Sequence, residues 1–288
     1  MLTQALGNAL SGLKVNQQAL AVISQNISNA NNEDYSRQIV SQESIALGGQ
    51  VGSGVRIKEI TRAVDDFIAK TVVTRGSDVA KANTIKDYYE QVQQYFGQPG
   101  SNNSIDNYVN GFFNSLNTLQ VNPKDASVKL GAVSAAKQVT DEVSNLAANI
   151  QEQRYQADKA VEVSVNTVNG IVKNLQSLNF AIVTAAKNNT SVSNLLDSVQ
   201  SELKKLSNEI DISYRFQDDG TIVVNAASGY TLLSGSSRYE LSYRASTSVE
   251  DFKGNIDLSP IELYSVDFDG TRANTPSATL ATGGKKSD

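Results

Sequence analysis

Residues 2–30, LTQALGNALSGLKVNQQALAVISQNISNA, decide the architecture that we expect for this chain. Their apolar residues recur with a seven-residue period, which is the pattern of a helix that packs against other helices. A helix of about 28 residues would be roughly 40 Å long, and it could not bury this face alone. The residues that we predict to form an assembly interface, here called the seam, are Leu6, Leu13, Leu20, Ile23 and Ile27.

The residues that flank the seam are polar but almost uncharged. Lys14 is the only charged side chain before Glu33, whereas a solvated coiled coil carries Glu and Lys at its flanking positions. Gln, Asn and Ser can hydrogen-bond to many neighbours without the cost of desolvating a charge. We therefore interpret residues 2–30 as a helix that packs on several sides in an assembly. The alternative is a polar tail that is disordered in the isolated chain. The two interpretations are compatible if this segment is disordered alone and becomes helical on assembly.

The composition excludes most catalytic chemistry. The chain has no His, no Cys and no Trp. It can therefore build neither a Ser-His-Asp nor a Cys-His triad, and it lacks the nitrogen and sulfur ligands of ordinary zinc sites. The absence of Cys also makes folding independent of the redox state of the compartment. We expect no catalytic residues, no metal and no cofactor.

The charge pattern limits the partners. The chain has 25 basic and 30 acidic side chains, a net charge of −5, and no basic run longer than Lys204-Lys205 or Lys285-Lys286. Nothing here could neutralise a phosphate backbone, so we expect no nucleic-acid partner. The N-terminus lacks the pattern of a cleaved signal peptide, and no stretch reaches the ~20 apolar residues of a membrane span. We expect a soluble chain with no membrane partner.

Beyond residue 30 the hydrophobic period predicts a mainly α protein with a smaller β part. This is an α+β fold in which long helices form a coiled-coil or bundle rod and a β-hairpin region follows. We predict that Asn122 is the N-cap and Pro123 the first residue of a helix that continues to about Lys187. The apolar residues that we assign to the bundle core are Val133, Val143, Ile150, Val165, Leu175 and Ile182.

The period changes from helical to alternating after residue 211, and Asp218-Asp219-Gly220 predicts a β-hairpin. The expected division of the chain follows these changes. It comprises an N-terminal heptad helix (1–40), an extended or β connector (41–62), a long-helix bundle (63–211), a β-rich region (212–270) and a disordered end (271–288).

Three motifs resemble chemical sites but depart from them. Residues 49–54 have the glycine spacing of a phosphate loop, but Val55-Arg56 stands where Lys-Ser or Lys-Thr is needed. Residues 267–270 begin like a calcium loop, but the glycine arrives at the fourth place instead of the sixth. Nothing in the sequence brings together two carboxylates as a glycosidase needs. The acids considered for that role are Asp65, Asp66, Asp218, Asp219, Glu250 and Asp251. We therefore predict that the chain is not an enzyme.

A set of short motifs extends from the first residues to about Leu241. They include Ala9-Leu10-Ser11-Gly12-Leu13, residues 24–31 and Tyr35-Ser36-Arg37, and they continue at residues 51–55, 61–68, 194–197, 202–203 and 229–235. In this order and spacing they resemble the axial proteins of the bacterial flagellum, which include rod, hook and hook-associated proteins. The residues that carry the N-terminal motif are Ser11, Gly12, Leu13, Asn26, Ile27, Asn29, Asn31, Tyr35 and Arg37.

This resemblance implies a structural adaptor at the hook–filament junction of the flagellum. It implies assembly with copies of the same chain into a ring, through packing of the N-terminal helix in an inner tube. The other implied partners are the hook protein, the second junction protein or filament, and an export chaperone. Export through the flagellar type III apparatus without signal cleavage would give an extracellular location.

The sequence departs from the family in two places. Asp34 stands where members usually have Gly before the Tyr of the motif, although Asp tolerates left-handed backbone geometry better than most residues. Members also pair the N-terminal helix with a C-terminal one, which this chain lacks. The resemblance therefore implies that the C-terminal half is missing.

A different class of function remains open at this stage. The β-rich region, Ile212 to Val266, could belong to an extracellular surface-binding protein or adhesin. Its contact aromatics would be Tyr230, Tyr239 and Tyr243. Alternating Tyr in strands more often packs within the sheet.

Overall fold

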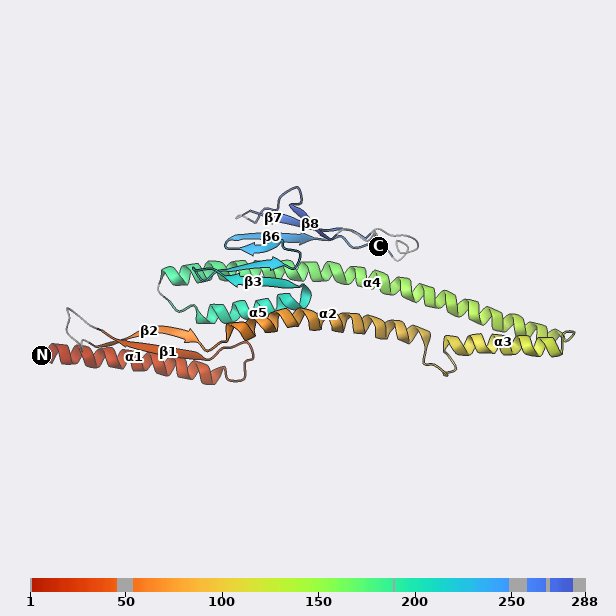
Figure 1. Cartoon of the computed structure of the whole chain (residues 1–288), viewed down its shortest axis with the longest axis horizontal. Helices are drawn as coiled ribbons and strands as arrows, with labels where there is room; N and C mark the ends of the chain where they lie inside the picture. Colours follow the sequence, from red (N-terminus) through yellow and green to blue (C-terminus); the bar gives the residue numbers. More distant parts are fainter. Residues whose placement is uncertain (1, 46–53, 189, 249–257, 268–269, 282–288) are drawn as a thin grey trace. The chain divides into compact units, whose positions relative to one another are not determined.

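The computed structural model describes residues 2–45, 54–188, 190–248, 258–267 and 270–281 (Figure 1). Within these ranges the chain forms five α-helices, a two-stranded sheet and a six-stranded sheet. The predicted α+β class is therefore confirmed. Several features considered above lie wholly or partly outside the described residues. They are the glycine-rich stretch 46–53, the acids Glu250 and Asp251, residues 268–269 and the pair Lys285-Lys286.

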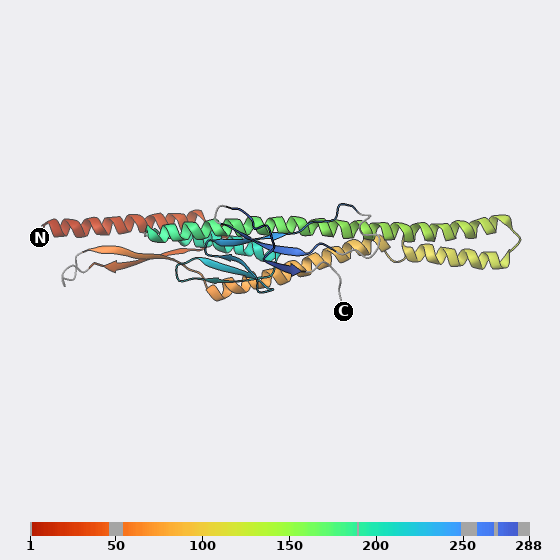
Figure 2. The ribbon, with the colours of Figure 1, turned by 90° about the horizontal axis from the view of Figure 1, so that it is seen from above.

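The N-terminal part is a helix followed by a β-hairpin. Helix α1 spans Leu2–Ser28, and strands β1 (Gln38–Ser44) and β2 (Val55–Arg62) pair antiparallel and lie along it (Figures 1 and 2). The Ala63 N–H donates to the Arg37 carbonyl (2.8 Å) and closes the base of the hairpin. We call residues 2–62 the arm.

The remaining helices begin and end near the predicted breaks. The Asp65 carboxylate accepts hydrogen bonds from the backbone N–H groups of Phe67 and Ile68 and so caps the first turn of the next helix. No helix in the described ranges combines the length and the apolar character needed to cross a membrane. The bounds are α2 Asp66–Phe96, α3 Ile105–Val121, α4 Ala126–Lys187 and α5 Ser193–Glu209.

The predicted start of the longest helix is wrong by a few residues. Asn122 terminates α3, since its N–H donates to the Thr118 carbonyl, and α4 begins only at Ala126. The residue that caps α4 is Asp125, whose carboxylate accepts from the N–H groups of Ser127 and Val128. An Asp three residues downstream offers the same capping chemistry as Asn122, and the sequence does not distinguish the two.

The six-stranded sheet follows α5 with its strands in chain order. The predicted hairpin is confirmed, because β3 (Ile212–Phe216) pairs antiparallel with β4 (Ile222–Ala226) across a turn in which Gly220 has φ +81°. The other strands are β5 Thr231–Ser234, β6 Ser237–Ser242, β7 Ile261–Val266 and β8 Ala278–Ala281. Strand β8 lies in the segment for which the sequence predicts no order, and it forms the edge of this sheet next to β7.

Two compact units divide the chain. The first, which we call the core unit, comprises residues 1–78, 167–241 and 263–278. Its buried apolar residues come from the end of α4, from α5 and from β4 and β5. The predicted core residues Leu175 and Ile182 lie in this unit and are 0% and 1% exposed, whereas Val165, which is 7% exposed, belongs to the second unit. Asn179 of α4 bonds to both the N–H and the carbonyl of Ile222, which ties this helix to the sheet.

The second unit, which we call the helical unit, comprises residues 79–166, 242–262 and 279–288. In it, α3 runs alongside the first part of α4 (Figures 1 and 2). The predicted core positions Val133 and Val143 are wrong: they are 66% and 49% exposed, whereas Ile150 is half-buried. The reason is that one neighbouring helix covers only one face of α4.

Candidate functional site: the N-terminal arm and its anchor

The seam residues lie together on the outside of α1. Leu6, Leu13, Leu20, Ile23 and Ile27 are between 52% and 71% exposed. The residues that α1 buries are Val15 and Val22, which are 5% and 7% exposed and lie on the opposite side of the helix at 3.6 residues per turn. The helix therefore uses one face to pack on the hairpin and leaves the predicted seam open.

Ser11 of the family motif joins α1 to the hairpin. Its hydroxyl donates to the Asn8 carbonyl (2.8 Å) and accepts from the Val55 N–H (3.2 Å). Gly54 has φ +115°, and a Cβ at this position would lie 2.6 Å from the Ser11 hydroxyl oxygen. The close approach therefore requires glycine at residue 54.

Gly12, the next residue of the motif, has no such role among the residues that the structure describes. A Cβ at Gly12 would meet nothing within 4 Å. Glycine in a helix interior costs roughly 0.5–1 kcal/mol relative to Ala. Packing within the described chain does not account for that cost.

Asn26 holds the returning chain against the end of α1. Its amide nitrogen donates to the Gln38 carbonyl (2.9 Å), and its oxygen accepts from the Gln38 N–H (2.8 Å) and the Tyr35 hydroxyl (2.9 Å). Burial and the nearby Asp197 raise the pKa of Tyr35, so this hydroxyl stays protonated. Asn26 and Tyr35 therefore fix the direction in which the chain leaves the helix.

The other polar motif residues are less constrained. The Asn29 amide donates to the Gln25 carbonyl (2.9 Å) in the last turn of α1. Asn31 and Arg37 are exposed, and the Arg37 carbonyl accepts the bond at the base of the hairpin. The structure thus brings Ser11, Asn26 and Tyr35 into contacts that build the arm.

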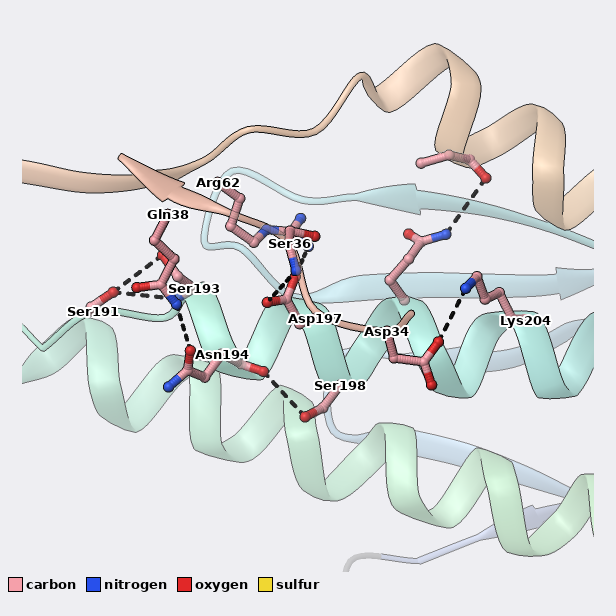
Figure 3. A network of polar contacts seen from close by, with 12 residues as sticks. Asp34, Ser36, Gln38, Arg62, Ser191, Ser193, Asn194, Asp197, Ser198 and Lys204 are labelled. Carbon is pink, nitrogen blue, oxygen red and sulfur yellow. Dashed lines mark hydrogen bonds and ion pairs between the residues drawn. The ribbon is translucent and has the colours of Figure 1, made fainter. Parts of the chain in front are cut away.

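A network of polar contacts anchors the arm to α5 (Figure 3). At its centre, Asp197 accepts a hydrogen bond from the Ser36 N–H (3.2 Å) and forms an ion pair with Arg62 of β2 (3.0 Å). The side chains of Arg62 and Asp197 are only 11% and 8% exposed. This buried pair joins segments that are 135 residues apart in sequence.

Further contacts lie on both sides of that pair. The Gln38 amide donates to the Asn194 side-chain oxygen (2.5 Å), and the Ser193 hydroxyl donates to the Ile60 carbonyl (3.0 Å). Asp34 accepts from the Ser201 hydroxyl (2.7 Å) and from the Lys204 ammonium (3.0 Å).

The charges beside the anchor are stabilised in their ionised forms. The hydrogen bond from Ser201, helped by Lys204, holds the pKa of Asp34 below its ordinary value. The hydrogen bond to Glu202 raises the pKa of Lys205. Asp34, which departs from the family pattern, therefore contributes a contact that glycine could not make.

A pocket of about 460 Å³ opens beside the network, within the core unit. Its walls carry carboxylates, amides and hydroxyls from both the arm and α5. They include Gln25, Asn29, Asn32 and Tyr35 on the arm, and Asn194, Ser198 and Glu202 on α5. In the part of the chain that the structure describes, no group of three or more acidic side chains is placed to hold a metal ion.

Three of the acids and tyrosines considered for other functions, Asp65, Asp219 and Tyr243, have structural contacts. Asp65 caps α2, and Asp219 accepts from the Thr221 hydroxyl and N–H (2.6 and 2.9 Å). The Tyr243 hydroxyl donates to Asp158, which is buried and also accepts from the Ser246 N–H (2.6 Å). Tyr239 is half-buried, and Tyr230 is 41% exposed.

The anchor itself is the part of the site that the sequence did not indicate. Asp197 was noticed only within the motif Asn194–Asp197, and nothing in the sequence assigned it to Arg62 or Ser36. A buried carboxylate needs a partner, but the identity of that partner depends on the tertiary fold.

The fold and the arm define an α+β protein whose N-terminal helix leaves one apolar face exposed among the described residues. The comparisons with known proteins identify the family. The model of the flagellar hook-associated protein FlgK helical domain matches residues 89–284. The chain therefore belongs to this family, and the resemblance seen in the sequence is confirmed.

The relatives agree with this assignment. Flagellar hook-associated protein 1 of Escherichia coli K12 is 29% identical over 247 residues, which cover 83% of this chain and 45% of the relative. The protein of the same name from Salmonella typhimurium LT2 is 28% identical over 273 residues, 89% of this chain and 49% of the relative. The protein of the same name from Bacillus subtilis 168 is 23% identical over 235 residues, which cover 78% of this chain and 46% of the relative. The chain spans about half the length of these relatives.

One solved structure has a similar fold. The flagellar hook junction protein FlgK from Burkholderia pseudomallei superposes with a TM-score of 0.53 at 24% identity, covering 75% of this chain and 37% of that protein. At this identity the match supports the fold and not a function.

Proposed function

We propose that this protein is a structural component of the bacterial flagellum, at the junction between hook and filament, and not an enzyme. Its family membership and its relatives, which are named flagellar hook-associated protein 1, support this function. The single observation that carries the mechanism is the division of α1 into two faces. Val15 and Val22 pack within the chain, whereas the seam stays exposed.

The exposed seam supplies the driving force for assembly. Burial of a Leu or Ile side chain that starts in water is worth roughly 1.5–3 kcal/mol. Several such residues in one row favour helix packing between subunits, and the uncharged flanks lower the cost of surrounding α1 on several sides. The glycine at residue 12 leaves room for close approach of a neighbouring helix.

The partners follow from this role. Copies of the same chain would pack against the seam and form a ring, with the hook protein on one side and the second junction protein or filament on the other. An export chaperone would hold the chain before assembly. Export without a cleaved signal would place the protein outside the cell, on the flagellum.

Because the chain spans about half the length of its relatives, its ability to build a junction needs a direct test. The host gene should be replaced by a form encoding these 288 residues with Leu13→Asp and Leu20→Asp. A charge at each seam position would have to be desolvated on assembly. We expect hooks without filaments and flagellin in the medium, scored by electron microscopy and motility.

A matched control keeps the added charge but moves it off α1. Ser134→Asp with Gln138→Asp introduces the same number of carboxylates at exposed positions of α4, and it should behave like the unmodified 288-residue form. Normal junctions from the seam variant would contradict the proposal. Failure of the unmodified form would show that these residues alone do not build a junction.

A further inference from the structure

A single covalent connection joins the arm to the rest of the core unit. The arm is N-terminal, so the chain passes from it to the other elements only once, through residues 63–65 between β2 and α2. Ala63 is bonded to the hairpin and Asp65 to α2, but the backbone dihedral angles between them do not by themselves fix one direction. The direction of α1 relative to α5 must therefore be set by non-covalent contacts.

Besides the hydrogen bonds of Gln38 to Asn194 and of Ser193 to Ile60, two sets of charged contacts hold the arm on α5. The inner contacts, from Arg62 and the Ser36 N–H to Asp197, are almost closed to solvent. The outer contact, between Asp34 and Lys204, joins side chains that are 46% and 39% exposed. Water and salt weaken the outer pair, and the inner pair is protected from both.

The pocket beside these contacts lowers the cost of turning the arm. Both of its walls are polar, with Asn29 and Tyr35 on the arm facing Asn194 and Ser198 on α5. Such groups exchange one hydrogen bond for another with water at little net cost. A turn of the arm about residues 63–65 would separate these walls without exposing apolar surface there. The buried charges, which carry the largest cost of being left unpaired, then restrain the turn together with the hydrogen bonds of Gln38 and Ser193.

From this geometry we infer that Asp197 is a positioning residue, whose paired bonds to Arg62 and Ser36 form a latch that fixes the direction in which the arm presents its seam. The latch ties two separate segments of the arm, β2 and the loop after α1, to one carboxylate on α5. A single attachment would leave rotation about it free, whereas two attachments to one group restrain it. The consequence for assembly, that a misdirected seam fails to pack, rests on the proposed function.

The latch can be tested directly by spin labelling. Because the chain has no Cys, introduced cysteines are the only labelling sites. Nitroxide labels at Gln17→Cys on α1 and Asn208→Cys on α5 occupy exposed positions away from the latch. Electron-electron double resonance on the purified 288-residue chain then reports the distribution of distances between the arm and α5.

We expect a narrow distribution for the labelled parent and a clearly broader or shifted one for Asp197→Ala. Asp197→Asn keeps an acceptor for the Ser36 N–H and loses the ion pair, so its distribution should be intermediate. Ser198→Ala, at the next position on the same helix, should leave the distribution unchanged. Circular dichroism confirms that each variant is folded.

Asp197→Ala leaves the buried Arg62 without its partner, and of these variants it has the largest risk of failing to fold. The double variant Arg62→Ala with Asp197→Ala removes both charges and should fold while still broadening the distribution. An unchanged distribution in either folded variant overturns the latch. A broadened distribution with normal junctions in the host supports the latch and overturns only its role in assembly.

Discussion

Helix α4 passes through both units, and its two parts differ sharply in burial. In the core unit Leu175 is 0% exposed, whereas in the helical unit Leu130 is 70% exposed. Both residues belong to the same continuous helix with the same kind of apolar spacing. The core unit surrounds α4 with α5 and a sheet, whereas around Leu130 the helical unit places only α3 beside α4. The same apolar spacing therefore contributes unequally to the free energy of unfolding, because the burial of each residue depends on the elements that pack against it.

The largest expected effect comes from making the same substitution, Leu to Ala, in the two parts of α4. Leu175→Ala should lower the free energy of unfolding by about 2–5 kcal/mol, because it removes buried methyl groups and leaves a cavity. Leu130→Ala makes the same change at an exposed site and should stay within about 0.5 kcal/mol. Urea unfolding followed by circular dichroism measures both. Similar losses for the two variants would mean that Leu130 is buried in the folded protein.

The next effect concerns the buried carboxylate of the helical unit. Asp158→Ala should cost about 1–3 kcal/mol, because the Tyr243 hydroxyl and the Ser246 N–H lose their acceptor. The loss should be local and appear as faster amide hydrogen exchange at residues 243–248. Asp141→Ala, which removes an exposed carboxylate bonded to Lys137 on the same helix, is the control and should leave the exchange there unchanged.

Alkaline pH should act on this same contact in the helical unit. Burial, together with the hydrogen bond to Asp158, raises the pKa of Tyr243 above its ordinary value of 10.0. The stabilising contribution is therefore complete below pH 10 and is lost as the pH rises further. Tyr243→Phe should remove this dependence. A pH titration of hydrogen exchange at residues 243–248 that is the same in both proteins would count against the contact.

Acid pH should act on the core unit, and this effect is the smallest. The hydrogen bond from Ser201, with Lys204, lowers the pKa of Asp34. Its contribution is present above the ordinary value of 3.8 and is lost as the pH falls below it. Because Asp34 is largely exposed, the change is small, and we expect it as a slight broadening of the arm distance distribution. Asp34→Asn should show the broadening already at neutral pH.

Much of the local structure was predictable from the residues. The seven-residue repeat predicted α1, the turn formers predicted the breaks between helices, and Asp218-Asp219-Gly220 predicted the β3–β4 hairpin. These signals are local, because helices and tight turns depend on residues a few positions apart. The N-cap of α4 was misplaced because Asn122 and Asp125 are chemically equivalent as caps.

The candidate site divides in the same way. The sequence pointed to the seam and to Ser11, Asn26 and Tyr35, but it gave no role to the polar residues. Asn26 bonds to Gln38 and Tyr35 to Asn26, which are contacts across a turn and hard to infer from spacing. Asp197 and Arg62 are 135 residues apart, and no local pattern relates them.

The sequence by itself determined that this chain forms long helices and a hairpin, that α1 carries an apolar row with almost no charge beside it, and that most catalytic chemistry is excluded. The tertiary structure decided which apolar faces are covered. It turned Val15 and Val22 inward and left the seam outside, buried Leu175 and exposed Leu130, and joined Asp197 to Arg62. Periodicity follows from the geometry of one helix, whereas burial and ion pairing follow from which distant segments the fold brings together.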